Sequence, residues 1–168
     1  MRQLCPKCKI VNVIRNGNSV IGSTLRKGWY TDDWLNGSII DHVAWNRNCK
    51  LPLYIPARLR DFWLKADVVT RIAFVWAYLV RAGEQYGCIN IRYEDVLTMP
   101  DMVIQRLATA LSLRPTDLTE THKRAALGHP ERTYRDFSED IAEPVRSYYL
   151  KTMGSLWDSF RVSGASSD

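Results

Sequence analysis

The stretch Lys9–Gly28, KIVNVIRNGNSVIGSTLRKG, decides the fold class of this 168-residue chain. Its first part, Lys9–Ile14, is short, β-branched and almost wholly apolar, which predicts a strand buried on both faces. The residues Asn-Gly-Asn then make a turn. A helix is expected from about Ser19 to Lys27, with Gly28 as its stop. The stretch is therefore interpreted as a strand, a tight turn and a helix, which is the unit of α/β folds.

The same stretch comes close to a triphosphate-binding loop. From Gly17 it has the pattern G-x-x-x-x-G-S-T, whereas the loop has G-x-x-x-x-G-K-[ST]. Ser23 occupies the position of the lysine that reaches the phosphates. Val20 and Ile21, inside the pattern, suit a helix face buried on a sheet better than an open loop. We therefore reject the triphosphate loop.

A different phosphate site is predicted from the same residues. Arg15 follows the strand at its carboxyl end, where ligands bind in open α/β sheets. Ser23 lies in the helix that follows, and Asn16 and Gly17 lie at the entrance of that helix, whose N–H groups favour negative charge. A guanidinium and a hydroxyl together suit a terminal phosphate monoester.

The rest of the chain completes the expected architecture. The other expected elements are the helix Asp67–Tyr86, the strand Cys88–Asp95, a helix from Pro100, and helices at about Pro115–Leu127 and Pro144–Phe160. The region Trp29–Lys65 is expected to be irregular. This order predicts an α/β fold with a partial parallel sheet flanked by helices and a helical C-terminal part. By length, residues 1–160 form a single domain, followed by a flexible tail at 161–168.

Composition narrows the possible partners. Hydrophobic residues make up 46% and charged residues 24%, as in ordinary globular proteins. The net charge of +5 is modest and scattered, so it does not indicate a nucleic-acid partner, whereas a small anionic ligand fits it. No secretion signal and no apolar run that could span a bilayer is visible, so the expectation is a soluble, cytoplasmic protein without a membrane partner.

The four cysteines do not have the pattern of a disulfide framework. CPKC, at Cys5–Cys8, is half of a zinc site, but the chain has no second CxxC. We therefore expect free thiols packed beside the strand, and no metal.

Two segments resemble the sulfotransferases. Lys9–Gly28 is similar to the 3′-phosphate-binding segment of that family, which is written as an apolar strand, an Arg, a turn and a Ser. Pro6 and Lys9 match the P-x-x-K that commonly precedes the strand. INIRYEDVLTMPDMVIQRLATALSL, residues 89–113, is similar to a second family segment with R-Y-E-D-L, a Pro, and a helix ending in Leu-Gly-Leu. The resemblance covers about Leu4 to Leu113.

This resemblance implies a fold related to the P-loop nucleotide kinases and a sulfate donor, 3′-phosphoadenosine 5′-phosphosulfate (PAPS), without a metal. It implies that Arg15 and Ser23 hold the 3′-phosphate of PAPS, or of the product 3′-phosphoadenosine 5′-phosphate. Tyr93 would contact the nucleotide near that phosphate. Glu94 and Asp95 are expected to shape the strand end instead of touching the ligand.

The two matching segments do not include the part of the family sequence that binds the phosphosulfate. In sulfotransferases, a Gly-rich loop with a lysine and the catalytic base both precede the Arg…Ser segment. Residues 1–14 contain no Gly, so we expect the isolated chain not to transfer sulfate at an enzymatic rate. No catalytic residue is assigned. His42, beside Asp41, is the one substitute base considered, but a lone loop histidine is more often structural, and His122 and His129 have no partner at a meaningful spacing.

The sequence leaves two main hypotheses. The first is a sulfotransferase-family domain that binds the 3′-phosphoadenosine end of PAPS for sulfuryl transfer to a hydroxyl or amine acceptor. The alternative is a non-catalytic relic that uses an exposed sheet edge for protein interaction, as a homo-oligomer or with a complementing chain. A nucleotide phosphotransferase is disfavoured because no lysine-bearing loop or metal-binding carboxylate pair is visible. The acceptor cannot be predicted, since acceptor loops vary on a shared scaffold.

Overall fold

A computed structural model of the chain describes residues 8–36, 43–46, 49–52, 55–113 and 134–162. The chain forms two compact units, which we describe separately: unit 1 comprises residues 1–16 and 80–133, and unit 2 comprises residues 17–79 and 134–168. The elements are, in chain order, β1 (Val11–Ile14), α1 (Gly17–Arg26), α2 (Asp32–Asn36), β2 (Val43–Asn46), β3 (Cys49–Pro52), the 3-10 helix η1 (Ala57–Leu59), α3 (Arg60–Lys65), α4 (Val68–Gln85), β4 (Ile89–Arg92), α5 (Tyr93–Thr98), α6 (Pro100–Leu111), the 3-10 helix η2 (Ser138–Asp140) and α8 (Val145–Val162).

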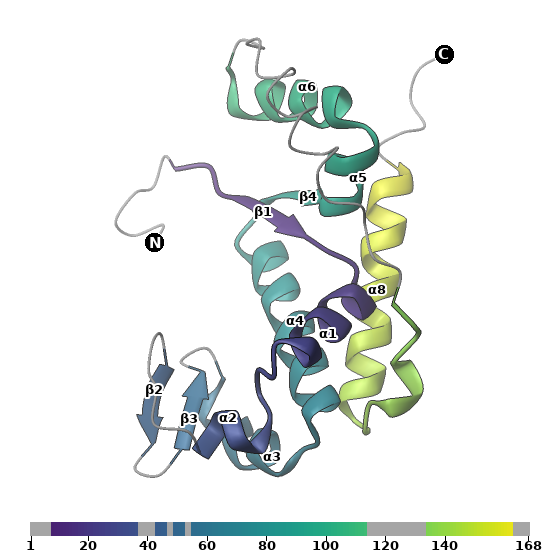
Figure 1. Cartoon of the computed structure of the whole chain (residues 1–168). Coiled ribbons are helices and arrows are strands. Elements are labelled where there is room, and N and C mark those ends of the chain that lie inside the picture. The colour runs from purple at the N-terminus through teal and green to yellow at the C-terminus, as the bar shows by residue number, and fades with distance from the viewer. Residues whose placement is uncertain (1–7, 37–42, 47–48, 53–54, 114–133, 163–168) are drawn as a thin grey trace. The chain divides into compact units, whose positions relative to one another are not determined.

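Unit 1 contains a two-stranded parallel sheet. β1 and β4 pair in a register that runs from Val11 opposite Ile89 to Ile14 opposite Arg92, and the two strands lie side by side in Figure 1. The prediction of two strands joined in parallel is confirmed. The described part of the chain is mostly helical, so the architecture is α/β in a loose sense.

β1 is not buried on both faces, as its sequence predicts. Val11 and Val13 are 37% and 57% exposed, whereas Ile14, on the other face, is 5% exposed. Asn12, on the same face as Ile14, donates from Nδ2 to Asn90 Oδ1 at 3.3 Å. α4 approaches that face closely at Gly83, because a Cβ added there would lie 3.2 Å from Asn12 Cγ. A continuous apolar run therefore forms a strand with one packed face and one exposed face.

The second strand is shorter than the predicted Cys88–Asp95. β4 ends at Arg92, and Tyr93 begins α5. Two carboxylates, Glu94 and Asp95, occupy the first turn of α5, where the helix dipole favours negative charge. This local preference for a helix start overrides the apolar, strand-like run that precedes it.

α6 starts with Pro100 at its first turn, as predicted, and ends in a left-handed residue, Ser112, with φ 58°. Lys9 closes the same end, since its Nζ donates to Ala110 O at 2.6 Å and to Ser112 Oγ at 3.3 Å. A cation that binds the last carbonyls of a helix is a common C-terminal cap. Lys9, the lysine of the P-x-x-K match, therefore stabilises the C-terminal end of α6.

Unit 2 contains α1 and the first part of α4, both close to their predicted bounds. α1 begins at Gly17, two residues earlier than predicted, and Gly28, with φ 67°, follows its last turn. The region predicted to be irregular instead holds α2, η1, α3 and the antiparallel pair β2–β3. These elements are too short for their periodicity to stand out from the glycine and prolines among them.

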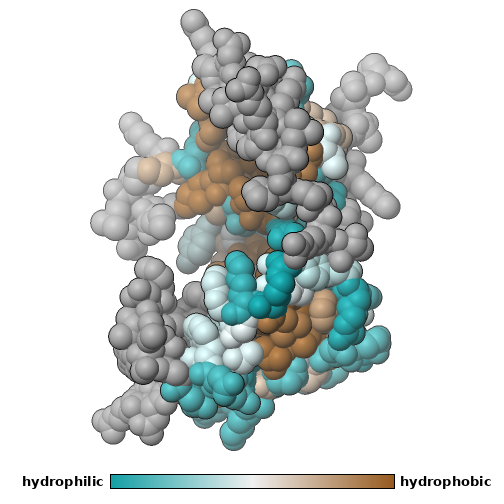
Figure 2. All heavy atoms as spheres, viewed as in Figure 1, coloured by the Kyte–Doolittle hydropathy of each residue, from teal (hydrophilic) through white to brown (hydrophobic). Residues whose placement is uncertain are grey.

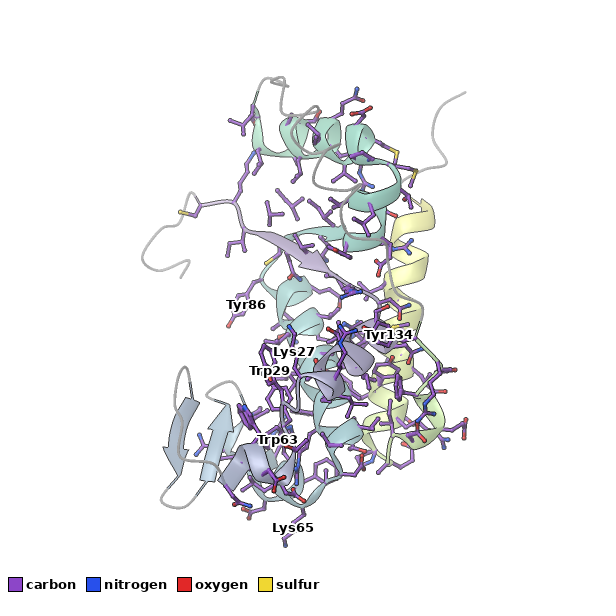
Figure 3. All side chains as sticks on the ribbon, in the orientation of Figure 1. Lys27, Trp29, Trp63, Lys65, Tyr86 and Tyr134 are labelled. Carbon is purple, nitrogen blue, oxygen red and sulfur yellow. The ribbon has the colours of Figure 1, made fainter. Side chains whose placement is uncertain are left out.

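Arg71 organises the interior of unit 2. Its side chain is 4% exposed and donates to the carbonyls of Trp63, Leu64 and Tyr30 at 3.1, 2.6 and 2.9 Å. It also pairs with Asp32 at 2.8 Å. Trp63 returns a hydrogen bond from Nε1 to Arg71 O at 3.2 Å. Figure 3 shows Trp63 pointing inward among the helices of unit 2, where it is 0% exposed.

The predicted C-terminal helix is confirmed as α8, which runs through Val162. The polar segment before it has little regular structure in its described part, apart from η2. The helix predicted at residues 115–127 lies outside the described residues. The predicted tail starts too early, because residues 161 and 162 belong to α8, and residues 163–168 also lie outside the described part.

Candidate functional site

Two of the predicted ligand residues meet at the carboxyl ends of the parallel strands. Because Ile14 and Arg92 are paired, the residues that follow them, Arg15 and Tyr93, leave the sheet at the same edge. The Arg15 guanidinium carbon lies 5.1 Å from the centre of the Tyr93 ring. This cation–π contact orients the guanidinium beside a half-buried aromatic ring. We call these two residues the Arg15–Tyr93 pair.

The turn after Arg15 is held from α5. The backbone N–H of Asn16 donates to Glu94 Oε1 at 2.7 Å. Glu94 Oε2 lies 4.0 Å from Arg92 Nε, and Asp95 Oδ1 lies 3.7 Å from Arg92 Nη1. The two carboxylates therefore brace the ends of the strands, as the resemblance predicts for them. The pairing of Glu94 with Asn16 joins residues far apart in the chain, and no sequence pattern announces it.

Ser23 belongs to α1, in unit 2. Its side chain is half-buried, and it makes no side-chain hydrogen bond with any of the described residues. That Ser23 shares one phosphate with Arg15 stays a prediction.

The two glycines of the near-match to a triphosphate loop are packing positions. Both lie on α1, which is helical from Gly17 onward. A Cβ added at Gly17 would lie 2.7 Å from Tyr149 Cε2, and one added at Gly22 would lie 2.7 Å from Tyr134 Cγ. Each glycine thus leaves room for a tyrosine ring against the helix. This explains the G-x-x-x-x-G spacing without any phosphate, in agreement with the rejection of the loop.

Asn18, in the first turn of α1, is the polar centre of this packing. Its Oδ1 accepts from Tyr149 Oη at 3.0 Å and from Phe137 N at 3.1 Å, and its Nδ2 donates to Asp136 Oδ1 at 3.2 Å. Burial, and then the charge of Asp136, raise the pKa of Tyr149 well above its usual value. The pKa of Asp136 is lowered, chiefly by the backbone N–H of Ser138. Asn18 was not among the residues singled out from the sequence.

A cation and an exposed tryptophan lie together after α1. Lys27 Nζ is 4.6 Å from the centre of the Trp29 ring, and Trp29 is 46% exposed. Figure 3 labels the two residues side by side. By contrast, Trp63 is a core residue. The aromatic residues of this region therefore divide between core and surface.

The histidines weighed as bases, His42, His122 and His129, all lie outside the described residues. In the part of the chain that the structure describes, no group of His, Cys, Asp and Glu could hold a metal ion. None of the described helices is long and apolar enough to cross a membrane.

The cysteines differ from the expected free thiols. Cys8 is disulfide-bonded, so the expectation is wrong for Cys8. Cys88, just before β4, is a free thiol and is half-buried.

No protein-family model, curated protein or solved structure matches this chain. The resemblance to sulfotransferases therefore rests on the two quoted segments.

Proposed function

We propose that this chain is a sulfotransferase-family domain that binds the 3′-phosphoadenosine end of PAPS, for sulfuryl transfer to a hydroxyl or amine acceptor. Arg15 binds the 3′-phosphate and Tyr93 lies against the nucleotide. The resemblance adds the Ser23 hydroxyl as a second phosphate contact. In the reaction, the bond between sulfur and the phosphate oxygen breaks, a bond between sulfur and the acceptor atom forms, and the acceptor loses a proton. We assign no residue to that proton transfer.

The observation that supports the proposal most directly is the Arg15–Tyr93 pair at the carboxyl ends of β1 and β4. Open α/β sheets bind ligands at this edge. A guanidinium carries five N–H donors in a planar fork that matches phosphate oxygens. The Tyr93 ring lies beside this guanidinium, 5.1 Å from its central carbon. Arg15 is predicted from its place after a strand and Tyr93 from the resemblance, and the two come from segments that are distant in the chain.

The test is a comparison of 3′,5′-ADP with AMP by titration calorimetry. The two ligands differ only in the 3′-phosphate, so the ratio of their affinities isolates its contribution. A hydrogen bond to a charged group contributes about 1.5–3 kcal/mol, so Arg15→Ala should weaken 3′,5′-ADP binding by about ten- to a hundred-fold. Its effect on AMP should be small.

Three further variants sharpen the result. Ser23→Ala and Tyr93→Phe each remove a neutral hydroxyl, whose contact contributes about 0.5–1.5 kcal/mol, so each should weaken binding less than Arg15→Ala does. Arg106→Ala is the matched control, because Arg106 is an exposed arginine on α6 in the same unit. Equal affinity of the unmodified chain for 3′,5′-ADP and AMP would refute the phosphate site.

One observation favours the alternative, a module for protein interaction. Val11 and Val13 expose apolar side chains on the same face of β1, and Figure 2 shows apolar atoms gathered in the region of β1 and β4. Exposed apolar patches often mark association surfaces. Light scattering coupled to size exclusion tests self-association. If the chain is an oligomer and Val13→Lys makes it monomeric without changing nucleotide binding, association is a separate property of this face.

A further inference from the structure

We infer that Glu94 is a positioning residue of the phosphate site, which acts by holding the turn that carries Arg15. The inference rests on the proposed function. It assigns Glu94 no contact with the ligand. Its task is to fix the backbone immediately after Arg15, so that the guanidinium stays beside Tyr93.

Glu94 links the two chain segments that carry Arg15 and Tyr93. Arg15 and Asn16 form the segment between the end of β1 and the start of α1. Glu94 follows Tyr93 in the first turn of α5 and accepts the Asn16 N–H at 2.7 Å. One side chain therefore links the residue after Arg15 to the residue after Tyr93. The two proposed ligand-binding residues, Arg15 and Tyr93, each come immediately before one end of this link.

The contact has a specific consequence for an anion site. A short segment without regular hydrogen bonding has several backbone conformations, and each would aim the guanidinium differently. The carboxylate selects one of them through a charge-assisted hydrogen bond, which is stronger than a neutral one. A preorganised donor binds more tightly because less motion is lost on binding. Glu94 should therefore raise affinity for the 3′-phosphate although its own charge is negative.

The Glu94 carboxylate can hold the turn without repelling a phosphate because both of its oxygens interact with other groups of the protein. One oxygen accepts from Asn16, and the other lies 4.0 Å from Arg92 Nε. The Glu94 side chain is only 16% exposed, so it has little freedom to swing toward a bound phosphate. Asp95 offers a close comparison. Its Oδ1 lies 3.7 Å from Nη1 of the same arginine, but among the described residues the Asn16 N–H is accepted by Glu94 and not by Asp95.

The experiment measures the ratio of the AMP and 3′,5′-ADP dissociation constants for four variants of the full chain. Glu94→Ala removes the acceptor, and Glu94→Asp withdraws it by one methylene. Both should lower the preference for 3′,5′-ADP by about five- to tenfold, while AMP affinity stays within about twofold. Glu94→Gln keeps an oxygen that can accept from Asn16 and should retain most of the preference. Asp95→Ala should lower the preference less than Glu94→Ala does, because it removes an ion pair with Arg92 but no hydrogen bond to Asn16.

The outcomes separate this inference from the proposed function. If the unmodified chain does not prefer 3′,5′-ADP, the proposed function itself fails. If it does, and Glu94→Ala or Glu94→Asp keeps the full preference, Glu94 is not a positioning residue. A purely structural role would lower both affinities together or only the melting temperature, which also overturns the inference. If Glu94→Gln and Glu94→Ala lose the same part of the preference for 3′,5′-ADP, the preference depends on the charge of Glu94 and not on its hydrogen bond to Asn16, which contradicts the inference. Circular dichroism of each variant verifies folding, and the near-isosteric Gln variant keeps the test decisive if Ala unfolds the chain.

Discussion

Adding a methyl group at Gly17 tests whether the glycines of α1 are packing positions or parts of a phosphate loop. The Cβ of Gly17→Ala would lie 2.5 Å from Tyr149 Oη, 2.7 Å from Cε2 and 2.9 Å from Cζ. Tyr149 is 1% exposed, so its ring cannot move into solvent to make room. Overpacking of this kind costs about 1–3 kcal/mol. If the ring shifts, its hydrogen bond to Asn18 is weakened too, at about 0.5–1.5 kcal/mol. We expect Gly17→Ala to lower the free energy of unfolding by about 2–3 kcal/mol.

Gly154→Ala is the matched control. Gly154 is an exposed glycine within α8, and a Cβ added there meets nothing within 4 Å. Alanine is favoured over glycine by about 0.8–1 kcal/mol in a helix interior, so this variant should be more stable than the unmodified chain. Urea denaturation followed by circular dichroism measures both. Opposite signs for the two substitutions support the packing explanation. If Gly17→Ala is as stable as the unmodified chain but loses nucleotide binding, the packing argument is refuted and the phosphate loop must be reconsidered.

Three further predictions concern residues whose roles the structure defines. Arg71→Met should lower the free energy of unfolding by about 3–5 kcal/mol, because it leaves buried carbonyls unpaired, whereas Asp32→Ala, at an 80% exposed partner, should change it by less than about 1 kcal/mol in the same urea titration. Ser112→Gly should raise the melting temperature, because the left-handed φ of 58° at that position strains any residue with a Cβ; no rise would contradict this. The pKa of the Asp136 carboxyl is lowered in the folded state, chiefly by the backbone N–H of Ser138, so its carboxylate stabilises the fold above the pKa of an unfolded Asp, about 4, and loses this effect as the pH falls further. Asp136→Asn should therefore flatten the acid side of the stability profile, measured from pH 5 to pH 2, and an unchanged slope would contradict the assignment.

The parts of the fold that could be predicted from the sequence are those with a local cause. β1 has a short apolar run, and α1 and the long α4 each end where a helix stop was expected: Gly28 follows α1 and Gly87 follows the predicted helix Asp67–Tyr86, both with positive φ. The parallel pairing followed from the order of the elements. The start of α5 at Tyr93 was missed because the strand-like residues before it were expected to continue as a strand to Asp95. Glu94 and Asp95 instead favour the first turn of a helix. Strand burial was also misjudged, since the apolar pattern of β1 does not tell which of its faces is covered.

The site shows the same division. Arg15 could be named because it follows a predicted strand, whereas Tyr93 was named from the resemblance alone, since the predicted strand ran through it to Asp95. The contacts that hold them could not be named. The residues of the Glu94–Asn16 bond are separated by 78 positions, and those of the Tyr149–Asn18 bond by 131. Such pairs depend on how the elements pack, and a single sequence carries no period or spacing that marks them.

The charges around the Arg15–Tyr93 pair indicate how a phosphate would be recognised there. Among the described residues, two arginines, Arg15 and Arg92, stand beside two carboxylates, Glu94 and Asp95, so the formal charges of these four side chains cancel. Arg92 forms ion pairs with both carboxylates, at distances of up to 4.0 Å. A dianionic phosphate would therefore gain little from a general positive field and much from the direction of the Arg15 donors. The direction of the Arg15 N–H donors, unlike the electrostatic field, depends on the backbone that carries them. The turn after β1 is therefore as important to such a site as the guanidinium itself.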